Sequence, residues 1–577
     1  MTVAGNRRIT RTWRWPVWIA LVGLLAFGTA AAVSWRCPFV PRIHDEFSQL
    51  LSADTLLHGR MANPRPEVWQ PLQSFHIIMN PSYASKYPLG PGLLIAAGIF
   101  LLGSPVSGCW FAACICSSSI CWMLAGVTNR RWAIFGGLLV AVHPAMQTSW
   151  SATLMSGWLT AAASALVLGA LLRLRRRFSP IASVVLGMGV AMLALTRPYE
   201  GLVYTIVSAG ILWCIWHRKP LARRMIDSVR ISCLAIVPVG CALAITLLQN
   251  QATTGHWTRM PYQVHEQTYG VAPLFIFQHQ RNPSMSPEEV PGTLRDYHYG
   301  WSLESYTARA GFTGWLLGIT QSLYHIVSFW GLSCSLLPLA ARPWSSRFRL
   351  LQLLFLAIVI QIMASSLVCW VFPHYLAPIL PWLVVLSVIG LKHTLHSWKK
   401  STVRKSSSSS PKRERGIQAI GDLGPIAVRI ANARPRALWR QSPLVCGLLM
   451  WQLAFLSYAA YRLPFRGNRE WAIRRHQMER QLLAMPGQHL VLVHYLPDHS
   501  FHEEWVYNRA APAEAAVLWA HGEREEWNQQ LISMYGQTHQ IWHAYVGQRG
   551  PKLIAEDRLQ SHFITAPTQA SPNNASL

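Results

Sequence analysis

The segment RCPFVPRIHDEFSQLLSADTLLHGR, residues 36–60, follows the first long apolar run of the chain and contains two adjacent acids, Asp45 and Glu46. After the acids, apolar residues recur at the spacing of one helix face, at Phe47, Leu50, Leu51 and Leu57. This pattern predicts an amphipathic helix that lies along the bilayer surface, with the acids at the membrane edge. Two interpretations of Asp45 are open. It caps the N-terminus of this helix, or it meets a lipid headgroup on one side and a water-soluble molecule on the other.

The composition indicates a polytopic α-helical membrane protein. Apolar residues make up 51% of the 577 residues and charged residues only 13%, and many apolar runs approach the roughly 20 residues that span a bilayer. The net charge of +27 comes from short basic clusters between these runs, where topology signals occur, so nucleic-acid binding is not expected. The eleven cysteines lie mostly in apolar runs without metal-ligand spacing, as is typical of small packing residues.

Basic residues also predict the orientation of the spans. Four arginines precede the first span, so the N-terminus is expected in the cytoplasm and the two acids outside, across a bacterial-type plasma membrane. No clear small-residue cleavage site precedes Arg36, so the first span is taken as retained. Hydropathy and charge predict about eleven spans, which leaves the C-terminus on the periplasmic side. They lie near residues 15–35, 109–127, 132–150, 152–172, 181–195, 202–216, 231–248, 315–339, 351–371, 376–395 and 444–461.

These spans divide the chain into four parts. Residues 1–398 are expected to form a membrane domain. Residues 399–442 are basic and rich in serine, which predicts a disordered cytoplasmic linker that attracts anionic membrane lipids. The last span, 443–461, leads to residues 462–577, where short apolar runs and one helical pattern predict a small outer α/β domain.

Polar side chains outside the basic clusters gather on the predicted outer side. They occur in two large outer loops, 36–107 and 249–311, and at the outer ends of spans. They are Asp45, Glu46, Lys86, Arg197, Glu200, His265, Glu266, His374 and Tyr375. Because ionisable groups at membrane depth are costly, they usually mark function. Structural alternatives stay open: Arg197 snorkels and pairs with Glu200, His374 is a polar span end, and HEQTYG at 265–270 caps a loop helix.

Three segments, taken in order, resemble the GT-C fold glycosyltransferases, and in particular the group of the protein O-mannosyltransferases and the lipid A aminoarabinose transferase. That group has an acidic pair in the first outer loop, a Lys-Pro stretch before the second span and a late Arg-Tyr-x-x-Pro-x-x-Pro segment. This chain has the acidic pair, the stretch SKYPLGPG at 85–92 with Lys86, and HYLAPILP at 374–381, where His374 replaces the arginine. The resemblance covers about residues 15–400 and leaves the C-terminal domain uncovered.

The resemblance implies an enzyme that moves a hexose or pentose from a polyprenyl-phosphate-linked donor to a lipid, glycan or protein acceptor on the outer face. Asp45 would be the general base or would orient the acceptor hydroxyl. Lys86 and Arg197 would stabilise the departing phosphate, with His374 and Tyr375 at its edge.

Glu46 would orient the partners of Asp45 or help to hold a divalent cation, and whether a metal is used is left open. Glu200, His265 and Glu266 are expected to border the substrate. The main alternative is a transporter or flippase, which predicts internal repeats with broken helices in matching positions, and no convincing repeat occurs. A non-catalytic scaffold would leave the one-sided acids and cations unexplained. Among enzymes, a lipid ligase or oligosaccharide polymerase is the nearest rival.

Overall fold

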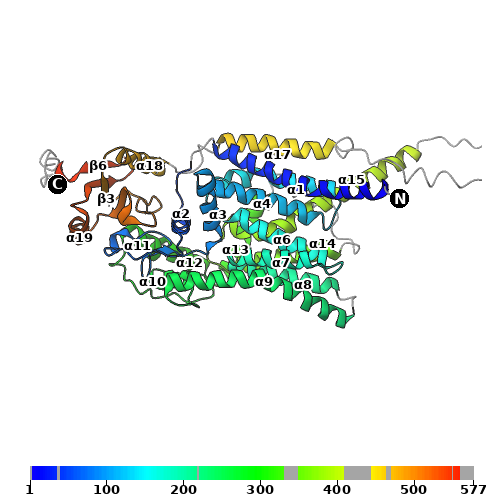
Figure 1. Ribbon diagram of the computed structural model, residues 1–577, viewed down its shortest axis with the longest axis horizontal. Helices are drawn as coiled ribbons and strands as arrows, with labels where there is room; N and C mark the ends of the chain where they lie inside the picture. The colour runs from blue at the N-terminus through cyan, green and yellow to red at the C-terminus, as the bar shows by residue number, and fades with distance from the viewer. Residues whose placement is uncertain are drawn as a thin grey trace, which may run out of the picture.

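The computed structural model describes residues 3–35, 39–216, 220–330, 349–408, 443–462, 470–548 and 550–558. A bundle of long helices carries an α/β unit at one end (Figure 1). Helix α1, Val3–Trp35, starts at the opposite end and runs toward the α/β unit, so the segment after it emerges beside that unit. The first outer loop and the C-terminal unit therefore share one end of the molecule.

The bundle contains helices that overlap each of the eleven predicted spans. Six candidate spans among the described residues are long and apolar enough to cross a membrane, so the count of eleven stays a prediction. The bundle helices are α1, α3 (Leu89–Leu102), α4 (Ser107–Leu124), α5 (Arg130–Ala141), α6 (Gly157–Leu174), α7 (Pro180–Ala194), α8 (Pro198–Ile215), α9 (Leu221–Thr254), α13 (Gly311–His325), α14 (Arg349–Ser365), α15 (Leu380–Ser408) and α17 (Pro443–Arg462).

Helix α6 lies at the centre of the bundle and is buried along nearly its whole length. Its alanines allow neighbouring helices to approach closely, as small residues do in membrane bundles. A Cβ atom added to Gly189 of α7 would lie 2.9 Å from the carbonyl oxygen of Ala163 on α6, so glycine is needed at this contact. The large hydrophobic cluster around α6 holds the outer helix ends in fixed positions, and the loops at those ends build the site.

The two outer loops contain short elements. The first holds α2 (His44–Leu57), η1 (Gln70–Leu72) and the antiparallel pair β1 (Ile77–Ile78) and β2 (Ala84–Ser85). The second holds α10 (Pro261–Thr268), α11 (Gly292–Arg295), η4 (Asp296–Trp301) and α12 (Ser302–Arg309).

Helix α2 forms where the periodicity predicts it, but its polar face is covered by protein instead of facing water. Polar residues on it, among them Glu46, Ser48 and Gln49, are as buried as Phe47 and Leu51. The helix lies between the bundle and the C-terminal unit (Figure 1). Tertiary packing therefore covers the face that the sequence pattern would leave in water.

The C-terminal unit is built on a four-stranded sheet. Its elements are α18 (Glu470–Leu483), β3 (Gln488–Tyr495), η12 (Pro512–Glu514), β4 (Val517–His521), α19 (Glu525–Tyr535), β5 (His539–Val546), β6 (Lys552–Ala555) and η13 (Glu556–Arg558). The strand order is β4-β3-β5-β6, with β3 parallel to both neighbours and β6 antiparallel to β5. Phe47 stacks on Tyr507 at 4.2 Å, and Leu51 joins the cluster of Leu490 and Leu518, so the unit shares its hydrophobic clusters with the first loop.

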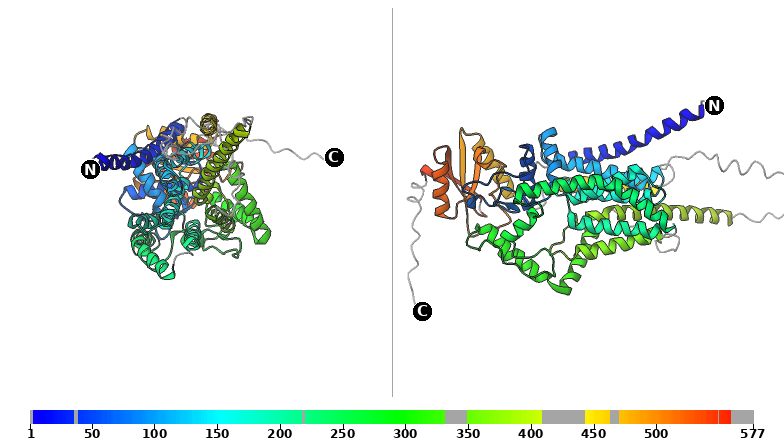
Figure 2. Two further views of the ribbon diagram at one scale, coloured as in Figure 1. Left: turned by 90° about the vertical axis from the view of Figure 1, so that its right-hand side faces the viewer. Right: turned by 60° about the horizontal axis from the view of Figure 1, so that its bottom comes forward.

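Helix α15 extends beyond the bundle at the end opposite to the sheet (Figure 2). It continues to Ser408, so the expected disordered linker is wrong for residues 399–408, which are helical. The helix of the predicted span 376–395 continues through the lysines and arginines that follow it, which are good helix formers. Residues 409–442 of that expected linker lie outside the described residues.

Candidate active site

A cavity of about 750 Å³ lies at the end of the bundle that carries the C-terminal unit. Its walls come from segments far apart in the sequence: the start of α2, the turn between β2 and α3, the start of α8, the end of α9, the second outer loop and the connection from α14 to η9 (Pro373–Ile379). Concave sites of this size with a few convergent polar groups are typical of ligand pockets.

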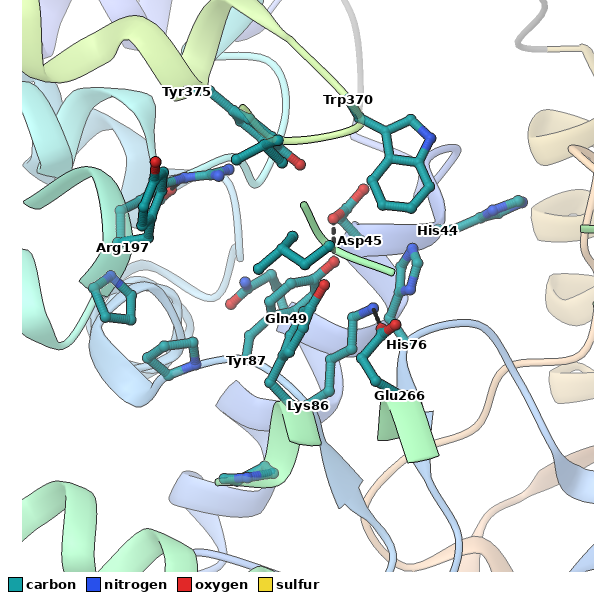
Figure 3. A pocket seen from close by; sticks show the side chains of 18 of the residues that line it. His44, Asp45, Gln49, His76, Lys86, Tyr87, Arg197, Glu266, Trp370 and Tyr375 are labelled. Atoms are coloured by element: carbon teal, nitrogen blue, oxygen red, sulfur yellow. Dashed lines mark hydrogen bonds and ion pairs between the residues drawn. The ribbon is translucent and has the colours of Figure 1, made fainter. Parts of the chain in front are cut away.

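Asp45 points into this cavity from the first turn of α2 (Figure 3). The N-cap of α2 is Ile43 and not Asp45, so the capping interpretation of Asp45 is wrong. The Tyr87 hydroxyl donates a hydrogen bond to Asp45 Oδ1. Burial and the Asp45 carboxylate raise the pKa of Tyr87 well above its usual range, so Tyr87 stays a donor. The pair places a hydrogen-bonded carboxylate at the cavity centre.

The Glu46 side chain accepts hydrogen bonds from backbone N–H groups at the N-terminus of α2. Its Oε2 accepts hydrogen bonds from the backbone N–H groups of Arg42 at 2.9 Å and Ile43 at 3.1 Å. Its Oε1 accepts from the Leu154 N–H at 3.1 Å, which ties α2 to the segment before α6. Glu46 is not among the residues that line the cavity. Glu46 is adjacent to Asp45 in the sequence, but the turn of the helix directs its side chain away from the cavity, toward the Leu154 N–H.

The two oxygens of Glu46 are not available to a metal ion. Both Glu46 oxygens face N–H donors, which a cation would have to displace. No group of three or more His, Cys, Asp or Glu side chains is arranged to hold a metal ion in the described parts of the chain.

Lys86 enters the cavity directly after β2 and is almost fully buried. Its Nζ lies 3.4 Å from Oε1 of Glu266, whose other oxygen lies 3.8 Å from Arg281. His265 Nδ1 is also 3.4 Å from Glu266, and His265 is not among the cavity-lining residues. Burial opposes ionisation of Glu266, but Lys86 and His265 outweigh it and lower the pKa of Glu266 to about 2. The predicted loop residue Glu266 therefore forms an ion pair with Lys86, and the imidazole of His265 lies beside this pair.

Arg197 enters from the other side of Asp45 (Figure 3). It is the N-cap residue of α8, and its Nη1 lies 3.4 Å from Glu200 Oε1. Its guanidinium lies 4.0 Å from the centre of the Tyr375 ring, which also lines the cavity. The interpretation of Arg197 as a snorkelling arginine paired with Glu200 predicted this pair, and the pair is present. The same arginine nevertheless reaches the cavity, because α8 begins at its rim.

His374 does not reach the cavity. Its ring stacks parallel to Phe372 at 5.8 Å, and only the neighbouring Tyr375 lines the cavity wall. The segment that carries both residues is the short 3-10 helix η9, in which successive side chains diverge by about a third of a turn. The structure therefore brings together Asp45, Lys86, Arg197, Glu200, Glu266 and Tyr375 and leaves Glu46, His265 and His374 outside the lining.

The sequence argument missed one whole wall of the cavity. This wall carries His44, His76, Tyr297, His298, Trp301, Trp370 and His502. These residues come from five separate segments, so no local spacing connects them. The run DYHYGW at 296–301, which is dense in aromatic residues, is the one local signal that could have drawn attention to the second loop. His502 shows that the C-terminal unit itself contributes to the cavity.

Comparisons with solved structures place this architecture among known folds. The crystal structure of ArnT from Cupriavidus metallidurans bound to undecaprenyl phosphate is 13% identical, with a TM-score of 0.51 over 95% of each chain. The apo structure of the same protein gives 12% identity, coverage of 97% and 96%, and a TM-score of 0.48.

The Archaeoglobus fulgidus oligosaccharyltransferase in complex with Zn and sulfate is 11% identical over 92% of this chain and 67% of that chain, with a TM-score of 0.46. No protein-family model matches the sequence, and no curated protein matches it. The likeness to the ArnT complex agrees with the sequence resemblance and extends it through the C-terminal unit, and the chain has the GT-C fold.

Proposed function

We propose that this protein is a membrane glycosyltransferase that moves a sugar from a polyprenyl-phosphate-linked donor to an acceptor hydroxyl on the outer face of the membrane. The observation that carries the proposal is the cavity in which the Asp45 carboxylate lies between two cations, Lys86 and Arg197 (Figure 3). The structure with the same fold that binds undecaprenyl phosphate supports a lipid-phosphate donor.

The chemistry needs a base near the acceptor and cations near the leaving group. In the proposed step, Asp45 takes the proton of the acceptor hydroxyl, whose oxygen attacks the anomeric carbon of the sugar. The bond from that carbon to the phosphate oxygen breaks, and the lipid phosphate leaves with the bonding electrons. Arg197 and Lys86 stabilise the negative charge that grows on this phosphate. Tyr87 orients Asp45 through its hydroxyl.

Glu266 and Glu200 are the counter-ions of Lys86 and Arg197 in the absence of a donor. Lys86 and Arg197 are both largely buried, and a buried cation without a counter-ion is costly. Glu266 and Glu200 compensate their charges before the donor arrives. The phosphate then joins existing ion pairs rather than meeting bare cations, so Glu200 and Glu266 are positioning residues.

The proposed orientation follows from charge. The C-terminal unit, whose His502 lines the cavity, lies at one end of the bundle, and α1 starts at the other (Figure 1). The arginines near the N-terminus favour the cytoplasm for that end, so the cavity would open on the outer, periplasmic side.

The test replaces Asp45 by Asn in the full chain. Asp45→Asn keeps the size and one acceptor oxygen for Tyr87 but cannot take a proton, so release of lipid phosphate from a lipid-linked sugar should fall at least about a hundredfold. Asp54→Asn is the matched control, because Asp54 lies on the same helix and accepts a hydrogen bond from the Ala510 N–H, away from the cavity. Turnover near the wild-type rate in Asp45→Asn would overturn the assignment.

A further inference from the structure

The cavity wall beyond Lys86 contains four imidazole rings. We call His44, His76, His298 and His502 the imidazole wall. Ring centres lie 5.9 Å apart for His44 and His502 and 6.3 Å apart for His44 and His76. Tyr297 bridges this group, at 5.8 Å from His76 and 4.9 Å from His298. Close packing of these rings makes one continuous surface from separate segments.

Polar atoms in this wall lack protein partners. His44 Nε2, His76 Nδ1 and His298 Nε2 are buried and have no hydrogen-bond partner among the described residues. The three residues are 7%, 6% and 5% exposed, and all of them line the cavity. Buried polar atoms nearly always have a partner, so these atoms indicate a polar ligand.

The imidazoles are held neutral. Burial lowers the pKa of His44 to about 4. Burial together with Lys86 lowers the pKa of His76 well below the usual range, and burial together with His265 does the same for His298. A neutral imidazole has one N–H donor and one acceptor nitrogen. Sugar hydroxyls also donate and accept, so they match such a wall better than a phosphate does.

Apolar faces accompany these polar atoms. The Tyr297 and Trp301 rings stack at 5.2 Å, and the Trp301 ring lies 6.5 Å from that of Trp370. All three residues line the cavity next to His502. A sugar ring presents C–H groups on its faces and hydroxyls at its edge, and this wall offers partners for both.

Among the described residues, the imidazole wall provides no available carboxylate for a positively charged sugar. An ammonium group needs an available carboxylate. Glu266 already lies within 3.8 Å of Lys86, Arg281 and His265. Glu504, whose charge acts on His44, is buried and already accepts hydrogen bonds from the Thr293 and Tyr495 hydroxyls. Lys86 would repel a second cation at this depth, where screening by water is weak. Asp45 carries the hydrogen bond from Tyr87 and belongs to the acceptor side.

We propose that the imidazole wall binds the sugar headgroup of the donor and selects an uncharged sugar over an amino sugar. This inference rests on the proposed function, because it assumes that the lipid phosphate lies near Lys86 and Arg197. Under this assignment the sugar extends from the phosphate toward the C-terminal unit, and His502 borders the sugar subsite on the side of that unit. The unit at the end of the chain then takes part in donor recognition.

The test compares two donors that differ in one group: arabinose and 4-amino-4-deoxyarabinose, each linked to undecaprenyl phosphate. Binding to the purified full chain is measured beside undecaprenyl phosphate alone. The neutral donor should bind about tenfold more tightly than the lipid phosphate, as expected for one or two added hydrogen bonds, and the amino donor no more tightly than the lipid phosphate. Equal or tighter binding of the amino donor would overturn the selectivity.

A pair of variants tests the wall itself. His298→Leu removes the polar atoms and should lose the tenfold preference, whereas His298→Gln places an amide near the Nε2 position and should retain most of it. Thermal unfolding of both variants controls for misfolding. Equal preference in His298→Leu and wild type would refute the subsite. If no lipid phosphate binds at all, the proposed function fails, whereas lipid-phosphate binding without discrimination between sugars refutes only this inference.

Discussion

The buried ion pair between Lys86 and Glu266 allows a test that separates structure from donor binding. Lys86→Met keeps the length of the side chain but removes the charge 3.4 Å from a carboxylate that is nearly inaccessible to water. Breaking such a pair costs about 3–5 kcal/mol when nothing else compensates the remaining charge. Arg281 remains at 3.8 Å from Glu266, so we expect the lower end of this range, about 3 kcal/mol.

Removing both partners should restore stability but not function. In Lys86→Met with Glu266→Gln no charge is left unpaired at this contact, and two hydrophobic or neutral groups of similar volume replace the pair. The unfolding temperature should return close to that of the wild type, whereas binding of undecaprenyl phosphate should stay weakened about tenfold, because one phosphate partner is still missing.

The assays are thermal unfolding and lipid-phosphate binding of all four proteins in the same detergent. A double variant that regains binding together with stability would show that Lys86 is only the counter-ion of Glu266. The phosphate would then depend on Arg197. A Lys86→Met protein as stable as the wild type would refute the energetic argument, since the carboxylate would then be satisfied without its closest cation.

Three further predictions concern other parts of the site. Arg197→Lys should weaken transfer and Arg197→Ala should weaken it further, roughly tenfold to a thousandfold, because the planar guanidinium between Glu200 and Tyr375 cannot be replaced by a point charge; donor turnover measures this. Glu46→Gln should destabilise the protein by about 1–3 kcal/mol, because one amide oxygen cannot serve three N–H donors, while turnover per folded molecule stays unchanged; unfolding temperature and turnover of the same sample decide this. Stability should fall as the pH drops from about 6.5 to about 4, because His44 takes up its proton near 6.5 when unfolded and only near 4 when folded. A pH series of unfolding temperatures should be flatter in that window for His44→Gln.

The order of the outer-loop motifs was enough to predict the fold. An acidic pair after the first span, a Lys-Tyr-Pro stretch before re-entry and a late Tyr-x-x-Pro-x-x-Pro segment resemble GT-C enzymes, and the structure has that fold. Helical periodicity also predicted α2 within a few residues. These features are local, since hydrophobic spacing and helix formation depend on near neighbours in the chain.

The same local patterns were poor guides to burial. The spacing of Phe47, Leu50, Leu51 and Leu57 indicates one apolar face, and so predicted a helix at the membrane surface. In the structure the C-terminal sheet packs on the other side, and Leu51 belongs to a hydrophobic cluster that includes residues more than 400 positions later, such as Leu490 and Leu518. No periodicity inside α2 contains that information, because it depends on where the sheet docks.

Asp45 and Glu46 show most clearly which features follow from the sequence and which follow only from the tertiary structure. The sequence by itself determined that a carboxylate pair begins a helix just outside the first span, because apolar runs and basic clusters define where the chain leaves the membrane. Only the tertiary structure decided which acid does what. A helix turns by about 100° per residue, so adjacent side chains face different surroundings. Glu46 meets the Leu154 N–H and secures the helix, whereas Asp45 meets Tyr87 and the cavity. The imidazole wall also depends on the tertiary structure, because its rings come together only when two loops and the C-terminal unit fold against one another.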